Sequence, residues 1–169
     1  MYKIPTKDRE TYGSHLDFLN EELEKAPDKI NVLEFGCGRF STFTFLNCKK
    51  VKLVCSIEMQ DKNYLNELKK EIKSKRWIYG FMETFKFAEM NALDFIRWYK
   101  PHIALVDGHM DSRPECVNIC VSMKVPVIVA HDFQYPGYGW ERIDLKGNYE
   151  KVVRTRPDGQ QTAFFYLKK

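Results

Sequence analysis

Two pairs of acidic and histidine residues in the second half of the chain carry the side chains best suited to chemistry. Asp107 and His109 follow one apolar run, and His131 and Asp132 follow another. Carboxylates and imidazoles bind cations and exchange protons near neutral pH. The carboxyl ends of neighbouring parallel strands converge, so we expect both acids to face one crevice if the two runs are such strands.

A second candidate site is the segment Val32-Leu33-Glu34-Phe35-Gly36-Cys37-Gly38, in which an apolar run breaks at a glycine. Glycines there let the backbone turn tightly and approach a ligand closely, because they have no Cβ. A dinucleotide fingerprint would need a third glycine where Ser41 stands, and an acid precedes the first glycine, which favours a cationic ligand over a diphosphate. Glu58 follows at about the 20-residue spacing of acids that bind ribose.

These residues must be positioned by elements that alternate between strand-like and helix-like patterns along the whole chain. Strands are expected at 31–35, 51–57, 102–106 and 125–130, with one more at either 77–81 or 85–90. Two further runs, 149–156 and 161–167, flank a Pro-Asp-Gly-Gln turn and predict a closing antiparallel β-hairpin. The pattern predicts a Rossmann-like α/β fold, with a mostly parallel seven-stranded sheet and helices on both faces.

Helices are expected between these strands. Ser14, with Asp17 three residues later, predicts a capped helix start, and Asp61 predicts another. Two more helices are expected over 91–99, which ends before Pro101, and over 113–122.

Length and composition set the class of protein. The 169 residues predict a single domain over residues 1–169, and 44% hydrophobic with 30% charged residues is ordinary for a globular protein. No apolar run approaches the length of a membrane helix, and the charged first ten residues do not resemble a secretory signal. Five cysteines without a Cys-x-x-Cys pair are expected to be reduced thiols, and Cys116 with Cys120 does not complete a zinc site. We therefore expect a cytoplasmic protein.

The glycine segment extended to Thr42 resembles motif I of class I S-adenosylmethionine-dependent methyltransferases, whose element order the chain also matches. The resemblance implies that S-adenosylmethionine is bound near Glu34, whose acid lies by the sulfonium and amino-acid part, and that Glu58 accepts from both ribose hydroxyls. It also implies that Asn91-Ala92-Leu93 is the adenine-contacting turn, with an amide in place of the usual acid. The implied cofactor residues are Glu34, Gly36, Cys37, Gly38, Ser41, Thr42, Glu58, Asn91, Ala92 and Asp107.

The two acidic and histidine pairs resemble those of metal-dependent O-methyltransferases of the sugar and catechol types. The resemblance implies a divalent cation, usually Mg²⁺, held by Asp107 and Asp132 with His131 as a third contact. A metal and a nearby base make the alkoxide form of an acceptor accessible, so Asp107, His131 and especially His109 are the candidate catalytic residues. His109 stands two residues after its acid, whereas the sugar enzymes place the histidine three after it. Arg113 is a candidate acceptor clamp. The alternative is that the histidines make only ordinary backbone hydrogen bonds.

A Gly-rich aromatic segment follows Asp132 and suggests a platform for a flat or sugar-like acceptor. Tyr138 and Trp140 are the candidate acceptor contacts, whereas Phe133 is expected to pack on the hairpin. A chain without a lid leaves the site open, which suits the end of a glycan better than an enclosed small molecule.

The main hypothesis is a metal-assisted O-methyltransferase for a carbohydrate or another polyhydroxyl acceptor. The alternatives are a metal-independent methyltransferase for a small molecule and a non-catalytic S-adenosylmethionine-binding module. Nucleic acid is an unlikely partner, because the net charge of +4 is dispersed and no Asn-Pro-Pro-Tyr-type motif is present. The oligomeric state is left open.

Overall fold

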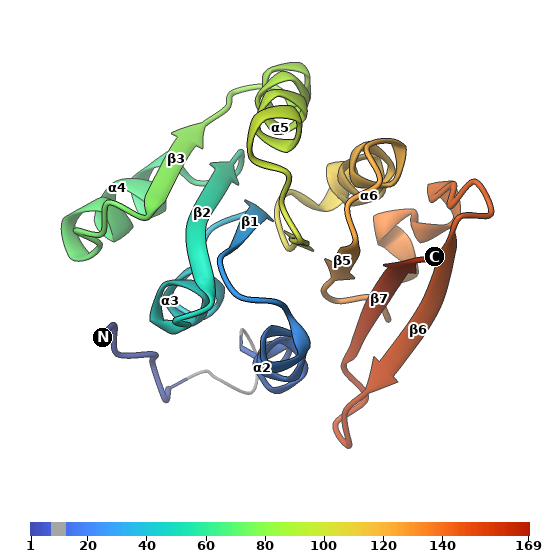
Figure 1. The fold of residues 1–169 in the computed structure, drawn as a ribbon, viewed down its shortest axis with the longest axis horizontal. Helices are drawn as coiled ribbons and strands as arrows, with labels where there is room; N and C mark the ends of the chain where they lie inside the picture. Colours follow the sequence, from blue (N-terminus) through green and yellow to red (C-terminus); the bar gives the residue numbers. More distant parts are fainter. Residues whose placement is uncertain (8–12) are drawn as a thin grey trace.

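The strands form one mixed sheet in the computed structural model, which describes residues 1–7 and 13–169. They lie in the order β3-β2-β1-β4-β5-β7-β6 (Figure 1). Strands β1 to β5 are parallel, whereas β7 is antiparallel to both of its neighbours. The bounds are β1 (Ile30–Phe35), β2 (Val51–Glu58), β3 (Trp77–Phe81), β4 (Ile103–Val106), β5 (Val127–Ala130), β6 (Tyr149–Thr155) and β7 (Gln161–Leu167). The predicted fold class, with its closing hairpin, is confirmed.

Helices cover both faces of this sheet. On one face, α5 (Phe85–Tyr99) and α6 (Arg113–Ser122) pack on side chains such as Leu33 and Phe35 of β1. On the other face, α2 (Leu16–Lys25), α3 (Ser41–Asn47) and α4 (Lys62–Glu71) pack on the residues that alternate with them, such as Val32. The two sets of helices lie on opposite sides of the strands in Figure 1. Because successive strand side chains point to opposite faces, each core strand contributes to both layers.

The order in which strands are added to the sheet reverses at the boundary between β1 and β4. It builds outward from β1 through β2 to β3, and then returns to place β4 on the other side of β1. The pairs Phe35–Val106 and Val106–Ala130 fix the register of β1, β4 and β5. Gly36, Asp107 and His131 therefore leave the sheet at the same level, at the switch point where α/β sheets bind ligands.

The segment between β3 and β4 differs in part from expectation. The third strand is Trp77–Phe81, while residues 85–90, the competing strand candidate, begin the helix α5. The reason is the 3.6-residue repeat of its buried side chains, Ala88, Ala92, Phe95 and Ile96. The helix expected to start at Asn91 thus starts six residues earlier.

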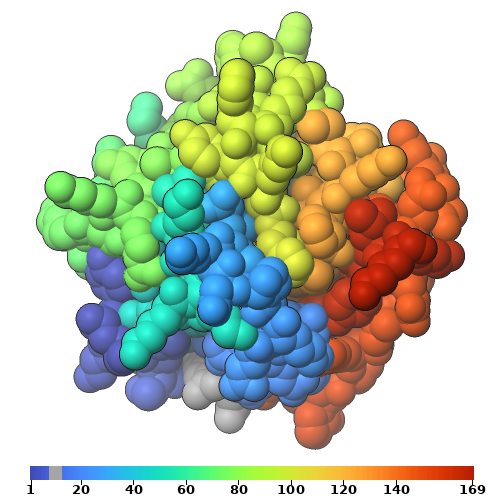
Figure 2. All heavy atoms as spheres, in the orientation of Figure 1, coloured from blue at the N-terminus to red at the C-terminus, as the bar shows by residue number. Residues whose placement is uncertain are grey.

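The edges of the sheet lie on opposite flanks of the molecule. In Figure 2 the closing hairpin, orange to red, forms one flank, and the green segment of α4 and β3 forms the other. Among the described residues, no helix combines the length and apolar character that a membrane span requires. Residues 8–10, part of the charged start that argued against a secretory signal, lie outside the described residues.

Candidate active site

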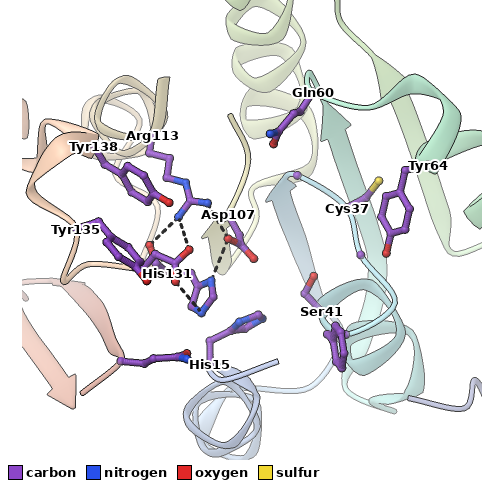
Figure 3. A pocket seen from close by; sticks show the side chains of 15 residues that line it. His15, Cys37, Ser41, Gln60, Tyr64, Asp107, Arg113, His131, Tyr135 and Tyr138 are labelled. Atoms are coloured by element: carbon purple, nitrogen blue, oxygen red, sulfur yellow. Dashed lines mark hydrogen bonds and ion pairs between the residues drawn. The ribbon is translucent and has the colours of Figure 1, made fainter. Parts of the chain in front are cut away.

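A cavity of about 610 Å³ opens at the carboxyl ends of β1, β4 and β5. Backbone hydrogen bonds extend the strand ladder one residue further, from Asp107 N to Phe35 O (2.9 Å) and from His131 N to Val106 O (3.1 Å). These bonds hold the first residue after each strand against its neighbour. Figure 3 shows the result, with Asp107 between Arg113 and His131 on one side of the cavity and Cys37 and Ser41 on the other.

The glycine segment forms the second wall, and its two glycines have different tasks. Gly36 has a φ of +83°, and a Cβ on it would lie 2.6 Å from the carbonyl oxygen of Asp107 and 2.7 Å from the Cα of Gly108. Gly38 lines the cavity, and a Cβ there would meet only ordinary contacts, 3.7 Å from Ser41 Oγ at the nearest. Gly36 therefore lets the turns after β1 and β4 pack together, whereas Gly38 keeps the cavity wide.

Glu34 lies beneath the glycine segment rather than on the cavity. Its Oε2 accepts hydrogen bonds from Thr42 Oγ1 (2.7 Å) and Ser56 Oγ (2.5 Å), and the side chain is fully buried. Burial raises the pKa of Glu34 to about 7, although the hydroxyls of Ser41, Ser56 and Thr42 lower it. The acid braces β1, β2 and the start of α3 against one another.

Glu58 joins the loops that follow β1 and β2. Its Oε2 accepts the backbone N–H of Cys37 (3.1 Å), and its Oε1 accepts that of Gln60 (2.7 Å) along with those of Met59 and Asp61. The carboxylate is buried, while Cys37 and Gln60 line the cavity. The predicted ribose acid is thus beside the cavity and fixes its rim.

Asn91 and Ala92 are not brought to this cavity, which corrects the expected adenine-contacting turn. Both belong to the middle of α5, where Ala92 is buried in the core and Asn91 Nδ2 donates to Phe87 O (2.8 Å). Asn91 borders a separate depression between β3 and α5. The turn was misplaced because residues 85–90 continue the helix.

Arg113 stands between the two acids that were predicted to share a metal. Its Nη2 donates to Asp107 Oδ1 (3.1 Å) and its Nη1 to Asp132 Oδ2 (3.3 Å). The guanidinium also donates to the carbonyls of Gly108 and His131 and is almost fully buried. The expected acceptor clamp is therefore occupied within the protein, and a fixed cation already lies between the acids.

His131 is held from both ring nitrogens. Its Nδ1 lies 3.0 Å from Asp107 Oδ1, and its Nε2 lies 2.7 Å from the Oγ of Ser14. Ser14 was expected to cap α2, but its hydroxyl binds His131 instead, and the helix begins at Leu16 without a side-chain cap. The ring of His15 meets that of His131 edge-on, with centroids 4.3 Å apart.

Charge and burial set opposite protonation tendencies in this cluster. Burial lowers the pKa of His131, but the charge and hydrogen bond of Asp107 and the charge of Asp132 outweigh it and raise the pKa above its ordinary value. Burial would raise the pKa of Asp107, but His131 and Arg113 hold it well below the usual range. Burial and then the neighbouring His131 lower the pKa of His15 to about 3, so His15 is neutral.

His109, the predicted base, lies outside this cluster. It lines a second cavity of about 360 Å³ together with Met59, Glu83 and Thr84. Its carbonyl accepts from the N–H (3.2 Å) and hydroxyl (3.0 Å) of Ser112, which forms the short turn η1 (Met110–Ser112) and directs the chain away from Asp107. His109 follows Asp107 by two residues, one fewer than the spacing of the corresponding acid and histidine in the sugar enzymes.

The aromatic segment contributes two tyrosines to the cavity, and Trp140 is not among its lining residues. Tyr135 and Tyr138 line it, and the ring of Tyr138 packs under the guanidinium of Arg113 at 4.5 Å. Trp140 is only 8% exposed and packs against Phe133 with the two rings tilted and their centroids 4.9 Å apart. Phe133 in turn contacts Phe165 of the hairpin, as expected. The segment includes the short turns η2 (Pro136–Tyr138) and η3 (Trp140–Arg142).

Several residues of the site could not be found from the sequence. Four residues that line the cavity carry no functional motif. Two stand just before helices, one lies on a helix, and one lies in the hairpin turn: His15, Gln60, Tyr64 and Gln160, respectively. Only the position of Gln60, two residues after the acid at the end of β2, offers a signal, because that loop must border the switch point.

Solved structures match this fold, whereas no protein-family model and no curated protein matches the sequence. The O-methyltransferase from Bacillus cereus in complex with SAH superposes with a TM-score of 0.67 at 15% identity, covering 98% of this chain and 84% of that one. MycE methyltransferase from the mycinamycin biosynthetic pathway, in complex with Mg and SAH, gives 0.60 at 11% identity, over 99% of this chain and 50% of that one. N-methyltransferase NodS from Bradyrhizobium japonicum WM9 gives 0.58 at 14%, over 93% and 87%. The chain has the fold of class I S-adenosylmethionine-dependent methyltransferases.

Proposed function

We propose that the protein is an S-adenosylmethionine-dependent O-methyltransferase for a hydroxyl group of a carbohydrate or another polyhydroxyl acceptor. The observation that carries the proposal is that the Asp107–His131 pair and the glycine segment line the same cavity at the switch point of the sheet. The names of two structural neighbours, an O-methyltransferase and MycE methyltransferase, support this choice of reaction.

The residues present fit the cofactor. The backbone from Gly36 to Gly38 forms a wall that a side chain at Gly38 would narrow, and Tyr64 closes it from α4. The second cavity, at Met59 and Thr84, would take the adenine end, so the acid Glu83 replaces the amide of Asn91 as the candidate adenine contact. When bound, the cofactor supplies a methyl group made electrophilic by its sulfonium.

The acceptor would bind on the opposite wall. Tyr135 and Tyr138 present ring faces that suit the apolar face of a sugar. His131, held by Asp107 at Nδ1, would take the proton of the acceptor hydroxyl at Nε2, where the acceptor replaces the hydroxyl of Ser14, as the new oxygen–carbon bond forms and the carbon–sulfur bond breaks. Holding donor and acceptor on two walls of one cavity supplies the proximity that the reaction needs.

The predicted magnesium set does not fit these residues. Mg²⁺ favours oxygen ligands in an octahedral shell, but the guanidinium of Arg113 lies between Asp107 and Asp132 and keeps the two carboxylates from sharing one ion, and His131 offers nitrogen. Asp107 and Asp132 are therefore not expected to share a magnesium ion.

The test is methyl transfer by the purified protein. We expect S-adenosylhomocysteine to bind in calorimetry, and S-adenosylhomocysteine to form from S-adenosylmethionine when oligosaccharides or other polyhydroxyl compounds are added. Tyr138→Ala should raise KM for the acceptor while leaving cofactor affinity unchanged, and Tyr99→Ala, on an exposed position of α5, is the matched control. Cofactor binding without turnover on any hydroxyl compound would favour the non-catalytic binding module. Transfer only to amines would refute O-methylation.

A further inference from the structure

We propose that His15, Asp107 and His131 bind a divalent transition-metal ion of the zinc, iron or manganese class on the floor of the cavity. One donor atom from each of these side chains can be chosen so that all three atoms lie within 4.8 Å of one another. This set shares two residues with the predicted magnesium site but replaces Asp132 with a histidine from the other end of the chain.

The donor atoms need only small movements to close on an ion. Asp107 Oδ1 and His131 Nδ1 lie 3.0 Å apart, joined by a hydrogen bond. Bonds of about 2.0–2.2 Å to a common tetrahedral ion separate neighbouring donors by about 3.3–3.6 Å, so an ion can replace the shared proton if the two side chains move apart by about half an ångström. The edge-on contact of the two imidazoles, 4.3 Å between centroids, brings the third donor within 4.8 Å of the other two.

His15 is the independent observation that points to a ligand. The ring is 1% exposed, and neither of its nitrogens has a hydrogen-bond partner among the described residues. Buried polar atoms in folded proteins are nearly always paired, so an imidazole with both nitrogens bare calls for a partner. Figure 3 shows His15 beside His131 at the cavity, where a metal ion would supply that partner.

The surroundings also have the second layer of contacts that metal sites use. Metal-binding histidines commonly fix their other ring nitrogen with a hydrogen bond, and His131 does so through Ser14 Oγ (2.7 Å). Arg113 likewise fixes the carboxylate of Asp107. These contacts orient two of the three donors before any ion is present.

The donor set selects the class of ion. Two imidazole nitrogens and one carboxylate oxygen suit zinc, iron and related ions, whereas Mg²⁺ and Ca²⁺ favour all-oxygen shells. Three protein ligands leave positions open toward the cavity, where an acceptor hydroxyl coordinated to the ion would be acidified and would lose its proton to water. With the ion bound, this acidification would replace proton transfer to His131, whose Nδ1 would be a ligand. That consequence rests on the proposed methyl transfer, but ion binding does not.

The test is direct metal binding to the chelator-treated protein. Calorimetry with Zn²⁺ and Mn²⁺ and the visible absorption of bound Co²⁺ should show one ion per chain, with Mg²⁺ failing to compete. His15→Ala and His15→Gln should each abolish the Co²⁺ spectrum and weaken binding by more than the roughly 10- to 100-fold expected for the outer variant Ser14→Ala. His102→Ala, at the opposite end of β4, is the matched control and should bind as the unchanged protein does. Melting of each metal-free variant confirms that it is folded.

The outcomes separate this site from the proposed reaction. Absence of stoichiometric binding, or equal affinity in the His15 variants and the unchanged protein, would overturn the metal site even if methyl transfer proceeds. Stoichiometric binding that depends on His15 supports the site even if no hydroxyl acceptor is methylated, in which case only the proposed function fails.

Discussion

The hydroxyl of Ser14 lies 2.7 Å from Nε2 of His131, across 117 positions of sequence. This bond connects the segment before α2 to the end of β5. It fixes Nε2 of the imidazole, whereas Asp107 fixes Nδ1. The cluster at the cavity is therefore assembled from three separate parts of the chain.

Replacing Ser14 tests this tie. Ser14→Ala leaves a buried ring nitrogen without its partner, and we expect a loss of about 1–3 kcal/mol in the free energy of unfolding. Under the proposed function kcat should also fall, with little change in cofactor affinity, because the orientation of His131 is lost. Ser122→Ala, at the exposed end of α6, should change stability by less than about 0.5 kcal/mol. Equal denaturation midpoints for the two variants would show that the bond contributes nothing.

Glu34 predicts a specific dependence of stability on pH. Its pKa rises from 4.5 to about 7 on folding, so the folded protein keeps a proton that the unfolded chain releases. This contribution is complete below pH 4.5 and is lost as pH rises through 7, a difference of about 3 kcal/mol at about 1.4 kcal/mol per pKa unit. Denaturation between pH 4.5 and 8 should show the unchanged protein losing stability relative to Glu34→Gln over this window. Parallel curves for the two proteins would contradict the raised pKa.

A comparison of alanine variants at Gly36 and Gly147 distinguishes the cost of backbone strain from the cost of a steric clash. Both have positive φ, +83° and +69°, but a Cβ at Gly147 meets nothing within 4 Å, whereas one at Gly36 meets Asp107 O at 2.6 Å. Gly147→Ala should cost about 1–2 kcal/mol of stability from strain alone. Gly36→Ala should cost several kcal/mol more, because the turns after β1 and β4 must separate. Chemical denaturation measures both, and similar losses would show that the two turns yield easily.

Arg113 predicts the cost of leaving two acids without their shared cation. Arg113→Met should destabilise the protein by about 3–5 kcal/mol, because Asp107 and Asp132 lose their shared guanidinium and the two mostly buried charges keep only His131 as a partner. Arg97→Met is the control, since its pair with Asp94 is exposed and 3.7 Å long, and should cost less than about 1 kcal/mol. The measurement is the urea midpoint of each variant at pH 7. A loss for Arg113→Met as small as that of the control would mean that water replaces the guanidinium.

The sequence predicted well those features that depend on strand ends. Parallel strands align their carboxyl ends, so apolar runs that stop at Gly36, Asp107 and His131 were enough to bring these residues to one crevice. The uncertain third strand was a different case. Residues 77–81 and 85–90 are both apolar and short, and the helical repeat of the second becomes visible only when it is continued through residues 91–96, which displaced the expected role of Asn91.

Side-chain direction within the loops was not predictable from residue type. His109 and His131 each lie next to an acid, yet the turn η1 directs His109 to the second cavity while β5 directs His131 to the first. Arg113 was assigned to a ligand because its partners are carbonyls and carboxylates on the loops after β4 and β5, and residue type does not show that the side chain turns back to them. The role of His15 could not be predicted at all, because a single histidine at the start of a helix can be exposed, buried or part of a site.

The contact between Gly36 and the backbone of Asp107 also limits how such a protein can diversify. The loop on the cofactor wall and the loop on the acceptor wall share this contact, so a bulkier residue at either position would disturb both walls. Tyr135 and Tyr138 face the same cavity from a separate segment, which follows β5. New acceptor preferences can therefore arise by exchange of that segment, while the wall that receives the methyl donor is inherited unchanged.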